Sequence, residues 1–64
     1  MMDKLKIFRQ NKGLSQVKFA QKIGVSQSMY EKVERGYMKP SRNFMGKLKK
    51  TYPEANIDSI FFGF

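Results

Sequence analysis

The stretch from Ser15 to Arg35 constrains the fold more than any other part of the chain, because it contains one short pattern twice. In each copy an apolar residue precedes a serine, a run of roughly eight residues with helical spacing follows, and a glycine ends the run. Serine is a favoured N-cap, and glycine readily adopts the left-handed conformation that ends a helix. The pattern therefore predicts two short helices joined by a tight turn at Gly24 and Val25.

The two predicted helices have clearly separated faces. Their inner faces are apolar, with Phe19, Ala20 and Ile23 in the first helix and Met29, Tyr30 and Val33 in the second. The outer arc of the second helix is polar and consists of Gln27, Ser28, Glu31, Lys32 and Arg35. The small residue Ala20 stands where the two helices must approach each other. This arrangement predicts a helix-turn-helix with an exposed polar second helix.

The charge of the chain favours a polyanionic partner. Thirteen Lys and Arg residues against five acidic residues give a net charge of +8 in 64 residues. All thirteen basic residues lie in residues 1–50 with only three of the acids, so the basic field belongs to the body of the domain. Cysteine and histidine are absent, which excludes disulfides, the familiar zinc sites and catalysis by His or Cys.

Three further helices are expected around the central pair. The first runs from Asp3, a plausible N-cap, to Lys12, with Gly13 as its stop; the fourth follows Ser41 to about Lys50; the last covers Ile57–Phe62 behind Asn56. Tyr37–Pro40 is expected to be a loop, because proline disfavours helix at the residue before it. No strand pattern is present. We predict a single all-α domain of five short helices over residues 1–64.

Two charged residues lie at the edges of apolar faces. On the first predicted helix, Arg9 borders the arc formed by Met1, Leu5 and Phe8. On the third, Glu34 borders the apolar arc. A charged group beside the core requires a partner.

Together these residues resemble the Xre/Cro/C1-type helix-turn-helix family of phage and bacterial regulators. The matching pieces are Arg9, LSQ at 14–16, FA at 19–20, IGVS at 23–26, Tyr30, VERG at 33–36 and Pro40-Ser41. The resemblance covers nearly the whole chain. It implies a fold like that of the lambda repressor DNA-binding domain, with the helix-turn-helix at about residues 15–35. In the family a charged pair ties the first helix to the third, which implies an ion pair between Arg9 and Glu34.

The resemblance also implies a DNA-binding surface. In this family the third helix enters the major groove, and the side chains available there for base contacts are Gln27, Ser28, Glu31 and Lys32. Gln27 can bond to adenine N6 and N7, and Lys32 to guanine. Contacts to the DNA backbone are expected from Gln16, Ser26, Lys39, Ser41, Arg42 and Asn43. Tyr37 either adds a hydroxyl to this set or belongs to the core.

The end of the chain is crowded with apolar side chains. Ile57, Ile60, Phe61, Phe62 and Phe64 all fall within the last eight residues. One short helix cannot bury all of them, and the family commonly dimerises through this region. We expect residues 56–64 to form the interface of a two-fold homodimer whose third helices lie about 34 Å apart. The alternative is that these residues cap the small core.

These expectations describe a sequence-specific regulator of transcription, a repressor, bound to a double-stranded operator. Because the chain ends where a larger repressor would begin its second domain, it is similar to a Cro-like minimal regulator. The alternative circuit is an antitoxin that binds its own operator. The protein partner would be a toxin in that case and an antirepressor in the case of a repressor. No cofactor, metal or small-molecule ligand is expected, and no catalytic constellation of residues is found, so an enzyme is not predicted.

Other classes fit less well. A basic amphipathic protein that binds a membrane surface or another polypeptide needs a long apolar stripe beside a basic face, whereas each predicted helix is short and interrupted. RNA binding is not indicated, because the sequence lacks the exposed aromatic residues and the sheet of common RNA-binding modules. Neither a signal peptide nor a membrane-spanning run is present, so a cytoplasmic protein, encoded by a bacterium or a phage, is expected.

Overall fold

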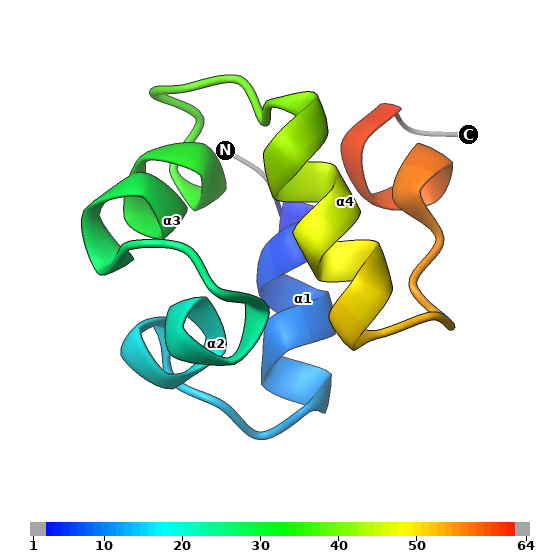
Figure 1. Cartoon of the computed structure of the whole chain (residues 1–64), viewed down its shortest axis with the longest axis horizontal. Coiled ribbons are helices and arrows are strands. Elements are labelled where there is room, and N and C mark those ends of the chain that lie inside the picture. Colours follow the sequence, from blue (N-terminus) through cyan, green and yellow to red (C-terminus); the bar gives the residue numbers. More distant parts are fainter. Residues whose placement is uncertain (1–2, 63–64) are drawn as a thin grey trace.

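The computed structural model describes residues 3–62, in which five short helices occur and no strand is found. They are α1 (Asp3–Asn11), α2 (Gln16–Ile23), α3 (Gln27–Glu34), α4 (Arg42–Thr51) and η1 (Asp58–Phe62). In Figure 1, α4 crosses in front of α1, with α2 and α3 on one side and η1 on the other. The predicted all-α fold is confirmed, although η1 is a wider π-type turn. Two residues used in the predictions, Met1 and Phe64, lie outside the described range.

The serines that precede α2, α3 and α4 cap these helices as predicted. Each side-chain oxygen accepts a bond from a backbone N–H three residues later: Ser15 from Lys18 at 3.2 Å, Ser26 from Met29 at 3.1 Å, and Ser41 from Phe44 at 3.0 Å. Each such cap contributes about 1 kcal/mol to stability. Asn56 caps η1 in the same way. Asp3 was predicted to be the N-cap of α1 but lies inside its first turn. Its negative charge still interacts favourably with the helix dipole there.

Gly24 makes the turn between α2 and α3. Its φ of 85° is left-handed, and the N–H of Val25 bonds to the carbonyl of Ala20 at 3.0 Å, as in a Schellman motif. No atom lies within 4 Å of the position that a β-carbon at Gly24 would occupy. Backbone conformation rather than space therefore favours glycine here, and the turn folds α3 back against α2.

The core consists of side chains from all five helices. Its fully buried large members are Tyr30, Phe19, Phe44, Leu5, Leu48 and Val33. Aromatic rings connect the helices across it: Phe19 of α2 lies 5.2 Å from Tyr30 and 5.6 Å from Tyr52, measured between ring centroids. Ala20, only 1% exposed, fills the contact between α2 and its neighbours. Burying one large apolar side chain of this kind stabilises the fold by about 2–3 kcal/mol.

One predicted position differs from the structure, and for a second one of two open roles is excluded. Met29, expected on the inner face of α3, is 39% exposed, because it lies beside a hollow between α3 and α4 rather than beneath another helix. Tyr37, for which two roles were open, is 79% exposed and does not belong to the core. The helical wheel gave the direction of Met29 correctly but could not show what lies opposite it.

The apolar end of the chain is largely used within the domain. Ile60 is 9% exposed and belongs to the core, while Ile57 and Phe61 pack against it and η1 lies against α1. Of the described members of the expected dimer interface, only Phe62 is a large exposed apolar side chain, at 55%. The alternative prediction, that the terminal apolar residues cap the core, is therefore correct for Ile57, Ile60 and Phe61. The short helix η1 buries more of its apolar side chains than expected, because side chains of both α1 and α4 pack against it.

Candidate DNA-binding surface

The C-terminal end of α3 is held by a buried charged network. Arg9 Nε donates to Glu34 Oε2 at 3.0 Å, and Arg9 Nη2 donates to Glu34 Oε1 at 3.2 Å. Arg9 Nη1 also donates to the carbonyl of Leu14 at 2.8 Å. Glu34 is only 4% exposed. One guanidinium thus joins α1, the segment that leads into α2, and the end of α3.

The charges of this network determine its ionisation. Burial alone would raise the pKa of Glu34, but the polar groups around its carboxylate, Arg9 above all, outweigh burial and hold that pKa below its ordinary value. The hydrogen bond to Glu34 raises the pKa of Arg9. Both side chains are therefore charged near neutral pH, and the position of α3 relative to α1 rests on an ionised pair.

Gln16 takes part in the same network. Its Nε2 donates to Glu34 Oε1 at 3.1 Å, which brings the first residue of α2 against the last residue of α3. From the sequence, Gln16 was expected to contact the DNA backbone. In the free protein its amide nitrogen bonds to Glu34 instead, because this carboxylate oxygen has a lone pair left beside Arg9. No spacing rule connects positions 16 and 34, so the sequence contains no sign of this bond.

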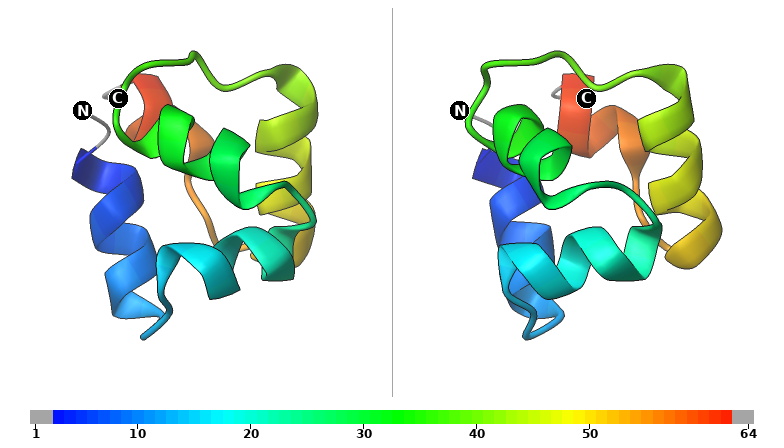
Figure 2. Two further views of the ribbon diagram at one scale, coloured as in Figure 1. Left: turned by 90° about the vertical axis from the view of Figure 1, so that its left-hand side faces the viewer. Right: turned by 60° about the vertical axis from the view of Figure 1, so that its left-hand side comes forward.

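The outer side of α3 carries the four residues predicted to contact bases. Gln27, Ser28 and Lys32 are exposed, and Glu31 is half-buried. In the left view of Figure 2, α3 lies across the face of the domain, with α2 below it and the loop to α4 passing above it. The N-terminal end of α3 points toward α4 in this view. The four side chains therefore share one accessible surface on the first two turns of the helix.

Apart from Gln16, the residues predicted to contact the DNA backbone lie at the start of α3 and around the start of α4. Lys39, Ser41, Arg42 and Asn43 are all exposed around the start of α4, and Ser26 is exposed at the start of α3. The side-chain oxygens of Ser26 and Ser41 accept the capping bonds, but each hydroxyl keeps its hydrogen for donation to an acceptor such as a phosphate oxygen.

Four exposed cations belong to the elements that surround this surface. Lys32, Arg35, Lys39 and Arg42 are exposed and come from α3, the loop after it and the start of α4. Within residues 3–62 the ion pairs are Arg9–Glu34 and Lys12–Glu54, so none of these four cations is paired with a described carboxylate. The field of these cations is available to a polyanion.

Two residues outside the predicted set also lie at this surface. Met29 is exposed beside Ser26, and Lys47 of α4 reaches the turn between α2 and α3, where its Nζ donates to the carbonyl of Gly24 at 3.1 Å. Met29 is exposed because no helix covers it, and the approach of α4 to this turn brings Lys47 within reach of Gly24. Neither could be found from helical periodicity, which describes one helix at a time.

Two capped helices joined by a glycine turn, with the polar side of the second helix exposed among cations, define a helix-turn-helix domain. A family model described as helix-turn-helix, of the Cro/C1 type, matches residues 5–54. The chain belongs to this family of DNA-binding regulators. No curated protein and no solved structure matches the chain.

Two other features are absent from residues 3–62. No helix among residues 3–62 has the length and apolar character needed to cross a membrane. The same residues contain no group of three or more His, Cys, Asp or Glu side chains placed to hold a metal ion.

Proposed function

We propose that this protein is a sequence-specific repressor of transcription that places α3 in the major groove of its operator. The observation that supports it is the exposed polar side of α3, which extends over the first two turns of the helix. Gln27 would bond to N6 and N7 of adenine, and Lys32 to O6 or N7 of guanine. Ser28 would donate or accept without strong preference, and Glu31 would accept from cytosine N4 or neutralise Lys32.

The exposed cations around α3 would set the register of the domain on the duplex. Lys39, Ser41, Arg42 and Asn43 would contact phosphates of one strand, with Ser26 and Gln16 completing the set. Such contacts carry no sequence information, but they fix the position from which α3 reads the bases. An antitoxin that represses its own operon would use the same surface.

A two-fold homodimer completes the proposal. The exposed Phe62 and a hollow lined by Lys39, Pro40, Phe61 and Phe62 provide apolar surface for a second copy at this end of the domain. In the dimer the two α3 helices would lie about 34 Å apart and read half-sites one DNA turn apart.

Selection of bound duplexes from a random pool, followed by titration against salt, tests this function. We expect operator binding to exceed binding to random DNA by about 10³-fold or more, with both falling steeply as salt rises. Gln27→Ala should lower the free-energy preference for the operator over random DNA by about 1–3 kcal/mol, because one bidentate base contact is lost.

The matched control is Gln10→Ala, which removes the same side chain from an exposed position on α1. It should leave the ratio unchanged. If Gln27→Ala preserves the full preference for the operator, the assignment of Gln27 to base reading is wrong.

A further inference from the structure

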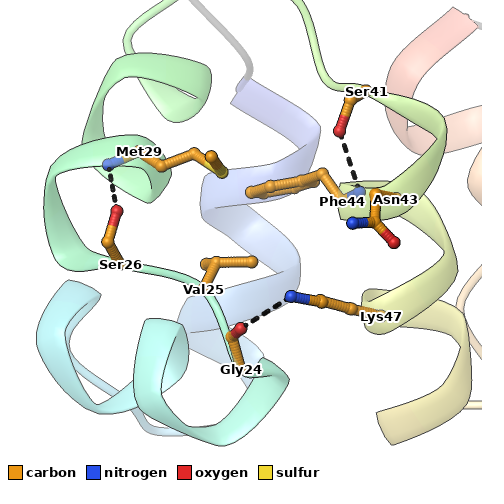
Figure 3. A pocket seen from close by; sticks show the side chains of 8 residues that line it. All are labelled: Gly24, Val25, Ser26, Met29, Ser41, Asn43, Phe44 and Lys47. Carbon is orange, nitrogen blue, oxygen red and sulfur yellow. Dashed lines mark hydrogen bonds between the residues drawn. The ribbon is translucent and has the colours of Figure 1, made fainter.

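A hollow of about 220 Å³ lies between the turn that joins α2 to α3 and the first half of α4 (Figure 3). Its wall has two chemical parts. One part is apolar, formed by Val25, Met29 and Phe44, and the other is polar, formed by Ser26, Asn43 and Lys47. Because a water molecule takes ~30 Å³ in the liquid, the hollow can hold a group of several heavy atoms.

The apolar part includes an exposed side chain that the packing of the domain does not require. Met29 points from α3 toward the hollow and is 39% exposed, whereas its neighbour Tyr30 is fully buried. Phe44 lies behind it and is only 1% exposed. The first turn of α3 therefore presents an apolar surface to the hollow, on a different side of the helix from Gln27, the predicted reader of adenine.

The polar part contains a cation held in place. Lys47 reaches across from α4, and its Nζ donates to the Gly24 carbonyl at 3.1 Å (Figure 3). An ammonium group has three N–H donors, so this bond orients Lys47 and leaves two donors for another acceptor. The two ion pairs among residues 3–62 do not involve Lys47, and Asn43 lies on the same helix one turn earlier.

We propose that this hollow receives one sugar-phosphate unit of the DNA backbone. The deoxyribose would lie against Met29 and Val25, and the phosphate would accept bonds from Lys47 and Asn43. A purely apolar occupant would leave the Lys47 charge unused, and a free inorganic anion would leave Met29 uncovered. The proposal rests on the proposed function, to which it adds Lys47 as a phosphate contact and Met29 as a sugar contact.

The test compares two lysines of α4 that differ in position but not in charge. Lys47→Met removes the cation from the hollow, and Lys50→Met removes an exposed cation from the last turn. Operator and random duplexes are titrated from low to high salt. Because one phosphate contact contributes about 0.9 to the slope of log K against log salt, Lys47→Met should lower this slope by about one. Binding of both duplexes should weaken roughly eightfold at 0.1 M salt.

Lys50→Met should change the slope much less, because it affects only the long-range field. Lys47→Arg should restore the slope. Lys47→Gln lacks the charge but keeps an N–H group that can donate to the Gly24 carbonyl. It therefore controls for destabilisation of the turn in Lys47→Met, and its slope should be lowered by the same amount. Ethylation of single phosphates adds a direct measurement: modification of one phosphate should weaken binding by the wild type clearly more than binding by Lys47→Met, in which only Asn43 still contacts that phosphate.

The outcomes separate this proposal from the function on which it rests. If the wild type binds no duplex, the proposed function and the role of the hollow are both wrong. If the wild type binds its operator but Lys47→Met and Lys47→Gln match Lys50→Met in slope and affinity, only the proposal for the hollow is wrong.

Discussion

The two ends of α3 are held in opposite ways. At its C-terminal end, Glu34 is 4% exposed and accepts bonds from Arg9 and Gln16. At its N-terminal end, the Ser26 cap and the nearby bond from Lys47 to the Gly24 carbonyl both lie in solvent-exposed surroundings. Removing one partner from a buried charge-assisted bond costs far more stability than removing one from an exposed bond.

This difference matches the task proposed for each end. The buried network determines the direction of α3 relative to α1 and α2. The side chains at the N-terminal end stay in water, where a DNA duplex can replace their hydration. A helix held firmly at one end can thus present Gln27 and Ser28 without burying them in protein contacts.

Breaking the buried end should have the largest effect on stability. In Glu34→Ala the guanidinium of Arg9, whose side chain is only 11% exposed in the wild type, loses its charged partner. Removing one partner of a buried pair costs about 3–5 kcal/mol. We therefore expect Glu34→Ala to unfold at a much lower urea concentration than the wild type. Urea denaturation followed by circular dichroism measures the change.

The matched control is the exposed pair of Lys12 and Glu54. Its atoms are closer, at 2.6 Å, but the side chains are 30% and 56% exposed. Glu54→Ala should therefore cost no more than about 1 kcal/mol. An equal loss in Glu34→Ala and Glu54→Ala would contradict the contrast between buried and exposed bonds.

Much of this contrast could be predicted from the sequence. The N-caps Ser15, Ser26 and Ser41, the turn at Gly24, the outward side of α3, and the edge positions of Arg9 and Glu34 all follow from local spacing. These features depend on one helix and its neighbouring residues. The family resemblance then paired Arg9 with Glu34, and the structure joins them.

The remaining features depend on how helices meet, which spacing does not describe. The bond from Gln16 to Glu34 and the bond from Lys47 to Gly24 each join residues far apart in the chain. Exposure of Met29 and burial of Ile60 likewise follow from what lies opposite each side chain. A helical wheel gives a direction, but only the packed domain shows whether that direction leads to core, hollow or solvent.

A smaller effect should come from pH. The pKa of Glu34 is lowered in the folded state, so its contribution to stability is complete above its ordinary value of 4.5 and is lost as pH falls toward the lowered folded value. We expect the stability difference between the wild type and Glu34→Gln to be largest near pH 7 and to shrink below pH ~4.5.

Denaturation of both proteins from pH 7 to pH 3 measures this difference. Glu54, whose pKa is also lowered through its bond to Lys12, is present in both proteins and cancels. A difference that stays constant with pH would show that Glu34 does not stabilise the fold through its charge.

The smallest effect should come from Tyr30, which lies one helical turn before Glu34 on α3. Burial raises the pKa of Tyr30, and among the described residues its hydroxyl is the buried side-chain atom without a hydrogen-bond partner. Because an unsatisfied buried hydroxyl opposes folding, Tyr30→Phe should leave stability unchanged or raise it by about 1 kcal/mol. Thermal and urea denaturation measure the change. A loss of stability above about 1 kcal/mol would show that the hydroxyl belongs to the Arg9–Glu34 network. The buried polar contacts of α3 would then extend one turn further along the helix.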